Sequence, residues 1–219
     1  MISFNAQHTL KHMMQRSYCC FRGAMKKKHS LPIALALLFL GTATASADWK
    51  LENEQSQLSF ISIKKGDIAE VHHFNQLEGT VDDKGNVQLT IQLASVATAI
   101  PIRDQRMQEM LFNTNLFPTA GLTATVDADQ ISMLKAGQMR VSALEGELSL
   151  HGQSSPVTAE LIVARLTDDT LLVTSQKPLV VQAGDFDLVE GVEKLREIAG
   201  LPSISRAVPV SFVLTFKKN

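Results

Sequence analysis

Strict alternation of apolar and polar residues is the feature that most constrains how this chain folds. In the run 87–93, Val87, Leu89, Ile91 and Leu93 take every second position, and polar residues take the positions between them. Successive side chains of a β-strand point to opposite faces of the sheet, so the run predicts a strand with one buried face. Turn-forming residues at 82–86 predict a hairpin with the preceding run 77–81.

The same period recurs towards the C-terminus. Leu144, Leu148 and Leu150 share one face of a run whose other face is polar, and a turn at 152–155 leads into an apolar run at 157–163. Further short strands are expected at 171–174, 179–181 and 208–216, where Pro209 suits only a strand start or an edge. Roughly eight to ten short strands separated by turns are typical of an antiparallel barrel or sandwich.

Two segments carry a helical period instead, and we expect short helices at 103–116 and 188–199. The first ends before Pro118, and the second ends at Gly200. Their apolar stripes repeat at intervals of three or four residues, which places each stripe on one helical face. The stripes consist of Met107, Met110, Leu111 and Thr114, and of Leu188, Val192, Leu195 and Ile198.

The first 47 residues differ in character from the rest. Lys26, Lys27 and Lys28 precede an apolar run at 31–40, which is followed by small residues that end in Ala45-Ser46-Ala47. This order predicts a secretory signal peptide over 1–47, cleaved after Ala47, with Met25 as an alternative start. The apolar run is too short to span a bilayer, which takes about 20 residues. An uncleaved anchor is the alternative reading.

Without this leader the charge balance changes. The whole chain has a net charge of −1, but all six basic residues before Asp48 lack an acidic counterpart. Residues 48–219 carry 15 basic and 22 acidic residues, a net charge of −7, and no cysteine. This composition predicts one exported domain without disulfides or thiolate chemistry. The acidic balance argues against nucleic acid as a partner and against charge-driven binding to anionic membranes.

Three histidines in this domain are candidates for chemistry. His72 and His73 are adjacent in a predicted strand and point to opposite faces, so they cannot ligate one metal together. We expect one to form a hydrogen bond near the mouth of the core and the other to be solvated. His151, beside Glu145 and Glu147 on a polar face, is expected at the surface. The chain has no nucleophile elbow and no phosphate loop, so we predict neither an enzyme nor a cofactor.

The segment around Arg103 carries the most information about a site. A strand ends, a proline turn follows, and a helix begins with Arg103, Asp104 and Arg106. Two interpretations remain open: a polar or anionic head group held at the helix start, or a guanidinium locked in a structural ion pair. Downstream, methionine and phenylalanine side chains form an apolar cluster that suits a lipid tail or an ordinary core.

These segments resemble the YceI-like family. The hairpin sequence 147–157 is similar to the family's strand and turn ending in Pro-Val. Arg103-Asp104, followed by Met107, Leu111-Phe112 and Phe117-Pro118, is similar to the family's helix. A third match joins 58–60 with 77–79, and the resemblance covers 48–219. It implies an exported, all-β, antiparallel lipocalin-like barrel with one or two short inserted helices, which binds polyisoprenoid or other long-chain lipids.

The resemblance therefore predicts a non-catalytic periplasmic protein with a lipid tail inside the barrel and a polar head at its mouth. Arg103 and either His72 or His73 are expected at the head. The expected ligand contacts are Phe60, His72, His73, Phe74, Leu89, Ile91, Arg103, Met107, Leu111, Phe112 and Phe117. The alternative is an interaction protein with a filled barrel core and its function on acidic loops, because periodicity cannot distinguish a hollow barrel from a filled one. The assembly is open, with a homodimer as one alternative.

Overall fold

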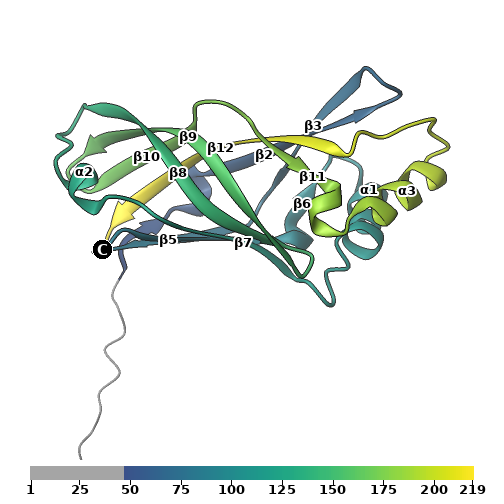
Figure 1. The fold of residues 1–219 in the computed structure, drawn as a ribbon, viewed down its shortest axis with the longest axis horizontal. Coiled ribbons are helices and arrows are strands. Elements are labelled where there is room, and N and C mark those ends of the chain that lie inside the picture. The colour runs from purple at the N-terminus through teal and green to yellow at the C-terminus, as the bar shows by residue number, and fades with distance from the viewer. Residues whose placement is uncertain (1–46) are drawn as a thin grey trace, which may run out of the picture. The chain divides into compact units, whose positions relative to one another are not determined.

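The computed structural model describes residues 47–219, which form twelve antiparallel strands and three α-helices (Figure 1). The predicted leader and the alternative start at Met25 lie outside these residues, except for Ala47, the first residue of β1. The strands are β1 (Ala47–Leu51), β2 (Gln57–Lys64), β3 (Ile68–Phe74), β4 (Leu77–Asp82), β5 (Asn86–Gln92), β6 (Val96–Ala97), β7 (Thr119–Thr125), β8 (Met139–Leu150), β9 (Gln153–Thr167), β10 (Thr170–Ser175), β11 (Leu179–Gln182) and β12 (Ala207–Lys218). The helices are α1 (Pro101–Arg106), α2 (Ala128–Ser132) and α3 (Val189–Ile198).

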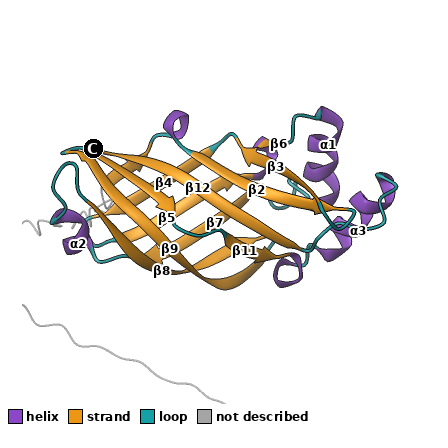
Figure 2. Cartoon of the chain, turned by 90° about the horizontal axis from the view of Figure 1, so that it is seen from above, coloured by secondary structure: helices purple, strands orange, loops and turns teal. Residues whose placement is uncertain are grey.

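Eight of the strands close into a barrel. They follow the order β1-β4-β5-β7-β8-β9-β10-β12, and β12 pairs back with β1. Closure removes the free edges that an open sheet would expose. Figure 2 shows the strands crossing the barrel wall, with α1 and α3 at one end and α2 at the other. The predicted all-β, lipocalin-like antiparallel barrel is confirmed.

The hairpin of β2 and β3 extends this sheet beyond the ring. β12 pairs with β1 through its last residues and with β2 through 210–213, so β1 and β2 share one flank of β12. A 3-10 turn, Asn53–Gln55, separates them. Pro209 pairs with Val180 of β11, and pairing with β2 begins only at Val210. The proline therefore stands where no hydrogen bond to β2 is required, as its position in the sequence predicted.

The predicted hairpin of 77–81 with 87–93 is formed by β4 and β5, and Gly79 lies opposite Leu89. Its turn is held by Asp82, whose Oδ1 accepts hydrogen bonds from the backbone amides of Lys84 at 2.9 Å and Asn86 at 2.8 Å. These bonds keep the pKa of the Asp82 carboxyl below its ordinary value, with the Asn86 side chain as the largest cause. Turn chemistry thus sets the register that turns Leu89 inwards.

The helix expected at 103–116 is shorter than predicted. α1 begins at Pro101, where the missing proline N–H costs nothing, and a π-helical turn, Met107–Leu111, ends the helix. The wider turn changes the helical register: Met107 is buried but Met110 is 36% exposed, and Phe112 is buried instead. The next residue, Asn113, has a φ of +48° and redirects the chain. A π-turn leaves no signature in the spacing of apolar residues.

The other helices differ less from expectation. α3 confirms the helix predicted at 188–199, and Gly200 follows it with a φ of +61°. α2 was not expected and raises the number of α-helices from one or two to three. It has only five residues, which is too short for an apolar stripe, and its N-cap is Asp127, whose carboxylate accepts hydrogen bonds from the amides of Asp129 and Gln130.

The barrel is filled at the end where β1 and β12 meet. Trp49, Leu51 and Phe216 are buried there, and a Cβ on Gly79 would lie 3.2 Å from Leu51 and 3.3 Å from Phe216. Such contacts leave no room for a ligand in the interior around Gly79. Within residues 47–219, no helix is both long enough and apolar enough to cross a membrane.

Candidate functional site: an apolar cavity at the helical end of the barrel

The end of the barrel that carries α1 and α3 is hollow. A cavity of about 470 Å³ lies between the strands and these helices. From the strands it is lined by Leu58, Phe60, Phe74, Leu89, Ile91, Ala120, Leu122, Leu148, Leu150, Val157, Leu179, Val181, Val208, Val210 and Phe212. From the helices and connections it is lined by Leu93, Ile100, Ile102, Met107, Leu111, Phe112, Ala183, Leu188, Val192, Leu195, Ala199, Leu201 and Ile204. This volume is within the range of small-molecule sites, and the filled-core alternative does not describe this half of the barrel.

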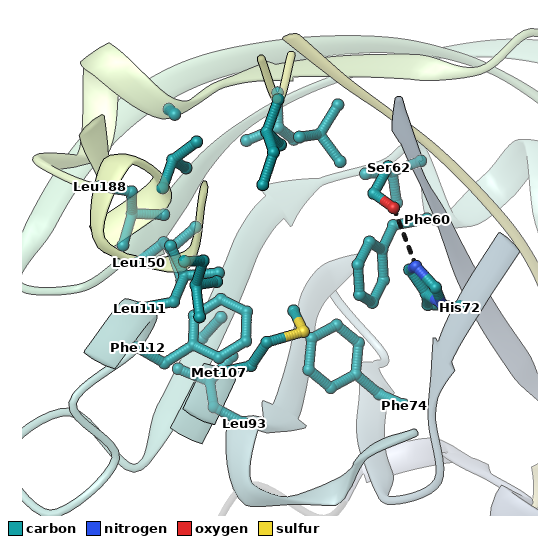
Figure 3. A pocket seen from close by; sticks show the side chains of 18 of the residues that line it. Phe60, Ser62, His72, Phe74, Leu93, Met107, Leu111, Phe112, Leu150 and Leu188 are labelled. Atoms are coloured by element: carbon teal, nitrogen blue, oxygen red, sulfur yellow. Dashed lines mark hydrogen bonds between the residues drawn. The ribbon is translucent and has the colours of Figure 1, made fainter. Parts of the chain in front are cut away.

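A row of aromatic rings forms one wall. The ring centroids of Phe60 and Phe74 are 5.3 Å apart, and those of Phe74 and Phe112 are 6.0 Å apart. Figure 3 shows the Met107 side chain between Phe74 and Phe112, with its sulfur facing the cavity. Offset rings with an adaptable thioether make a surface that fits apolar chains of irregular shape. Phe60 and Phe74 come from the β2–β3 hairpin, and Met107 and Phe112 come from the π-turn and the residue that follows it.

His72 is the most buried polar group of the cavity, with only 3% of its surface exposed. Its Nε2 lies 2.9 Å from the Oγ of Ser62 on the neighbouring strand (Figure 3). Its Nδ1 is buried and has no hydrogen-bond partner among the described residues. Burial, and secondarily the positive charge of Arg103, hold the pKa of His72 below its ordinary value, so the ring is neutral near pH 7.

The bond to Ser62 bears on what Nδ1 can do. In one tautomer the Ser62 hydroxyl donates to Nε2 and Nδ1 carries the proton; in the other Nε2 donates and Nδ1 is an acceptor. Either tautomer leaves Nδ1 without a partner among the described residues. A buried polar atom without a partner costs about 1–3 kcal/mol, which a bound polar group would relieve.

Arg103 is held in a network that connects α1 to the β2–β3 hairpin. Its Nη1 donates to the Glu70 carboxylate at 2.7 Å, its Nε donates to the Thr98 hydroxyl at 2.8 Å, and its Nη2 donates to the Thr98 carbonyl at 2.6 Å. The Thr98 hydroxyl in turn donates to Asp104. Of the two interpretations that the sequence left open, the structure contains the ion pair.

Glu70 joins this network from both sides. Lys64 lies 2.9 Å from its second oxygen, and the hydrogen bond from Lys64 is the largest cause that holds the pKa of Glu70 below its usual value. Arg103 is therefore neutralised by a carboxylate and does not present a free charge to the cavity. Arg106 also lines the cavity, and no ion pair engages it among residues 47–219.

Nine of the eleven predicted contact residues line the cavity, and two do not. His73 follows His72 in β3, so its side chain is on the outer face of the sheet. Its partner on the neighbouring strand β2 is Ser59. Phe117 lies outside the cavity, where its ring packs on His151 with centroids 4.6 Å apart. The absence of both from the lining corrects the sequence prediction, and the cause for Phe117 is the early end of the helix at Leu111.

His151 also differs from expectation. It was expected at the surface beside Glu145 and Glu147, but it lies in the turn after β8 with a φ of +53° and is half-buried. Its Nδ1 is 3.3 Å from the Phe186 carbonyl oxygen. Its role is to fix the turn against the segment before α3.

Several lining residues escaped the sequence analysis. Ser62 is two residues from Phe60 and faces the same side by strand parity, so the period contained the signal. Arg106 was noted only as a charge at the start of a helix. The lining stripe of α3 (Leu188, Val192 and Leu195) was recognised as helical, but nothing in its spacing said that it covers a cavity.

No metal site is apparent in the part of the chain that the structure describes. Within it, no three His, Cys, Asp or Glu side chains come together in a group that could hold an ion. The charged residues of the cavity are Lys64, Glu70, Arg103 and Arg106, and they lie with Ser62 and His72. The arrangement offers an apolar container with polar groups on one side.

Comparison with known proteins agrees with this architecture. Residues 49–216 match the model of the YceI-like domain. A polyisoprenoid-binding domain from Saccharophagus degradans, implicated in plant cell wall breakdown, is 36% identical, with a TM-score of 0.78 over 80% of this chain and 100% of that one. BcnA from Burkholderia cenocepacia is 19% identical, with a TM-score of 0.59 over 75% and 98%, and it shares the fold. No curated protein sequence matches the chain significantly. Because the family model spans most of the sequence, the chain belongs to the YceI-like family.

Proposed function

We propose that this protein is an exported, non-catalytic binding protein for an isoprenoid or another long-chain lipid. The tail lies in the cavity, and the polar end of the lipid lies beside His72 and the charged residues. The observation that carries the proposal is the cavity of about 470 Å³ with an almost entirely apolar lining. The polyisoprenoid-binding description of the relative from Saccharophagus degradans supports the same ligand class.

Affinity for such a ligand would come from its tail. Each buried CH₂ group contributes about 0.8 kcal/mol, so a chain of several isoprene units gains enough to remain bound without charged contacts. The aromatic wall of Phe60, Phe74 and Phe112 offers contact area without polar atoms. Polar recognition would be limited to His72 Nδ1 and the guanidinium of Arg106, the two cavity groups without a protein partner among the described residues.

Export rests on the leader, with its three lysines, apolar run and Ala45-Ser46-Ala47 end. We infer a periplasmic protein that begins at Asp48. Mass spectrometry of the intact protein isolated from cells measures this start directly. A mass corresponding to residues 48–219 is expected, whereas a retained leader contradicts the inferred cleavage.

The ligand is tested on the protein isolated without denaturation. Native mass spectrometry, followed by organic extraction and lipid analysis, should find one long-chain lipid per protein molecule. The Leu122→Trp variant, which places a large ring in the cavity, should carry less of it, while Val141→Ser on the outer wall should carry as much as the parent. An empty protein in every preparation contradicts the proposal.

A further inference from the structure

The mouth of the cavity is surrounded by a closed ring of three segments. Glu70 on the β2–β3 hairpin is bonded to Arg103 of α1. On the other side, the hairpin is bonded to the segment that follows α3, through Lys65 N to Ser203 O at 3.1 Å and Ser205 N to Ile63 O at 2.8 Å. The α3 helix closes the ring by packing against the π-turn, where a Cβ on Gly191 would lie 2.8 Å from the Met110 carbonyl oxygen.

This ring carries exposed isoleucines on all three of its segments. Ile100 and Ile102 line the cavity and are still 44% and 51% exposed, so the apolar lining continues to the outer surface at this point. Ile68 is 42% exposed and pairs with Lys64, a lining residue, so both face the mouth. Ile198 is 45% exposed and precedes Ala199, which also lines the cavity.

Charge at the mouth differs from that of the whole domain. Residues 48–219 have a net charge of −7, but the charged residues that line the cavity are three cations, Lys64, Arg103 and Arg106, and one anion, Glu70. At the tip of the hairpin Lys65 and Asp67 offset each other. Over the three segments of the mouth (63–70, 98–111 and 189–206), seven basic and seven acidic residues balance. An apolar rim without net charge, in a domain of net charge −7, is the face that meets the least repulsion at a bilayer surface, where long basic side chains reach phosphates while isoleucines enter the acyl boundary.

We call the four exposed isoleucines on these three segments the mouth ring (Ile68, Ile100, Ile102 and Ile198). We propose that the mouth ring docks on the surface of a phospholipid bilayer. Docking there places the cavity opening against the acyl chains, so a tail passes between bilayer and barrel without crossing water. The domain's net negative charge opposes adsorption through other faces. The proposal rests on the proposed function for its purpose, but docking is measured independently of any bound ligand.

The contact is tested with single reporters on the full chain. Ile68→Trp places a fluorophore on the mouth ring at a residue that does not line the cavity, and Val141→Trp places one at a 56% exposed position of the outer wall. The native Trp49 is buried and contributes the same background to both. With vesicles of phosphatidylethanolamine and phosphatidylglycerol that contain brominated acyl chains, the emission of Ile68→Trp should be quenched and that of Val141→Trp should not. Equal quenching at both positions, or none at either, overturns the proposal.

A second measurement removes the rim. The double variant Ile100→Ser with Ile102→Ser should bind the same vesicles about tenfold more weakly, while Val141→Ser binds like the parent. Both sets of side chains are exposed, so the fold is retained. Both variants keep the same remaining surface, so a ratio near one overturns the proposal.

Lipid content of the same preparations separates the two proposals. Quenching at the mouth ring in a protein that never carries lipid contradicts the carrier function and supports docking. Lipid found in a protein whose mouth ring is not quenched overturns docking and supports the carrier function.

Discussion

The Ser62 hydroxyl and the His72 imidazole lie 2.9 Å apart on adjacent strands, inside a cavity whose other walls are almost entirely apolar. Their bond uses one nitrogen of the ring and leaves the other without a partner among the described residues. A neutral, buried histidine of this kind is a polar group enclosed by an otherwise apolar wall. It also makes the stability of the barrel depend on pH.

The pH dependence has a definite sign. Burial lowers the pKa of His72 in the folded protein, so the unfolded chain binds the proton more readily. Stability should therefore fall as pH drops below the ordinary histidine value of about 6.5. Urea unfolding between about pH 7 and pH 5 measures this slope above the range in which carboxylates titrate. His72→Gln, which cannot titrate, should flatten the slope, and His73→Gln should not. An unchanged slope in His72→Gln contradicts the assignment.

The Arg103 network should stabilise the mouth more than an exposed ion pair does. Arg103→Gln removes the bond to Glu70 and two bonds to Thr98, and we expect a loss of about 1–2 kcal/mol in the free energy of unfolding. The matched control is Lys177→Gln, whose pair with Glu160 at 2.8 Å is largely exposed and should contribute below about 0.5 kcal/mol. Chemical denaturation compares the two. Equal losses would mean that the network is no more than a surface pair.

Added volume distinguishes the hollow half of the barrel from the filled half. Leu150→Trp extends into the cavity and should change the free energy of unfolding by less than about 1 kcal/mol while it reduces bound lipid. Leu51→Trp places the same ring among packed residues and should cost about 1–3 kcal/mol or more. Denaturant titration and lipid analysis of both variants test this contrast. Similar costs at the two positions would show that the cavity does not accept side-chain volume.

The contact between α3 and the π-turn should be sensitive to one methyl group. A Cβ on Gly191 would lie 2.8 Å from the Met110 carbonyl oxygen and 2.9 Å from the Leu111 Cα, so Gly191→Ala must displace α3. We expect a loss of about 1–3 kcal/mol. Gly184 has no atom within 4 Å of the same position, so Gly184→Ala should be neutral or slightly stabilising. Thermal unfolding of the pair checks this; a stable Gly191→Ala would mean that α3 is loosely seated.

Much of the wall could be predicted from the sequence. Period-two runs identified β4, β5, β8 and β12, and strand parity placed His72 and His73 on opposite faces, because alternation is a local property of an extended chain. The prediction was wrong where local geometry departs from the regular period. The π-turn at Met107–Leu111 ends the helix early. As a result, Phe112 is buried and lines the cavity, whereas Phe117 lies outside it.

The partner of Arg103 is the clearest example of what the sequence left open. An arginine at a helix start suits either a bound anion or an acid elsewhere in the chain. Glu70 lies 33 residues away, and only the β2–β3 hairpin brings it to 2.7 Å. Arg106, three residues further along the chain, is the cavity-lining cation without an ion pair in the described residues, and nothing in the local sequence separates the two.

The sequence by itself determined which side of each strand faces inwards, because side-chain alternation follows from backbone geometry. It could not determine whether those inward residues meet. That depends on the distance across the closed barrel, and so on strand pairing between residues far apart in the chain. Leu89 and Leu51 both alternate with polar neighbours, yet Leu89 lines a cavity of about 470 Å³ and Leu51 packs in the filled half. Tertiary structure decided this difference: α1 and α3 hold one end of the barrel open, and side chains fill the other.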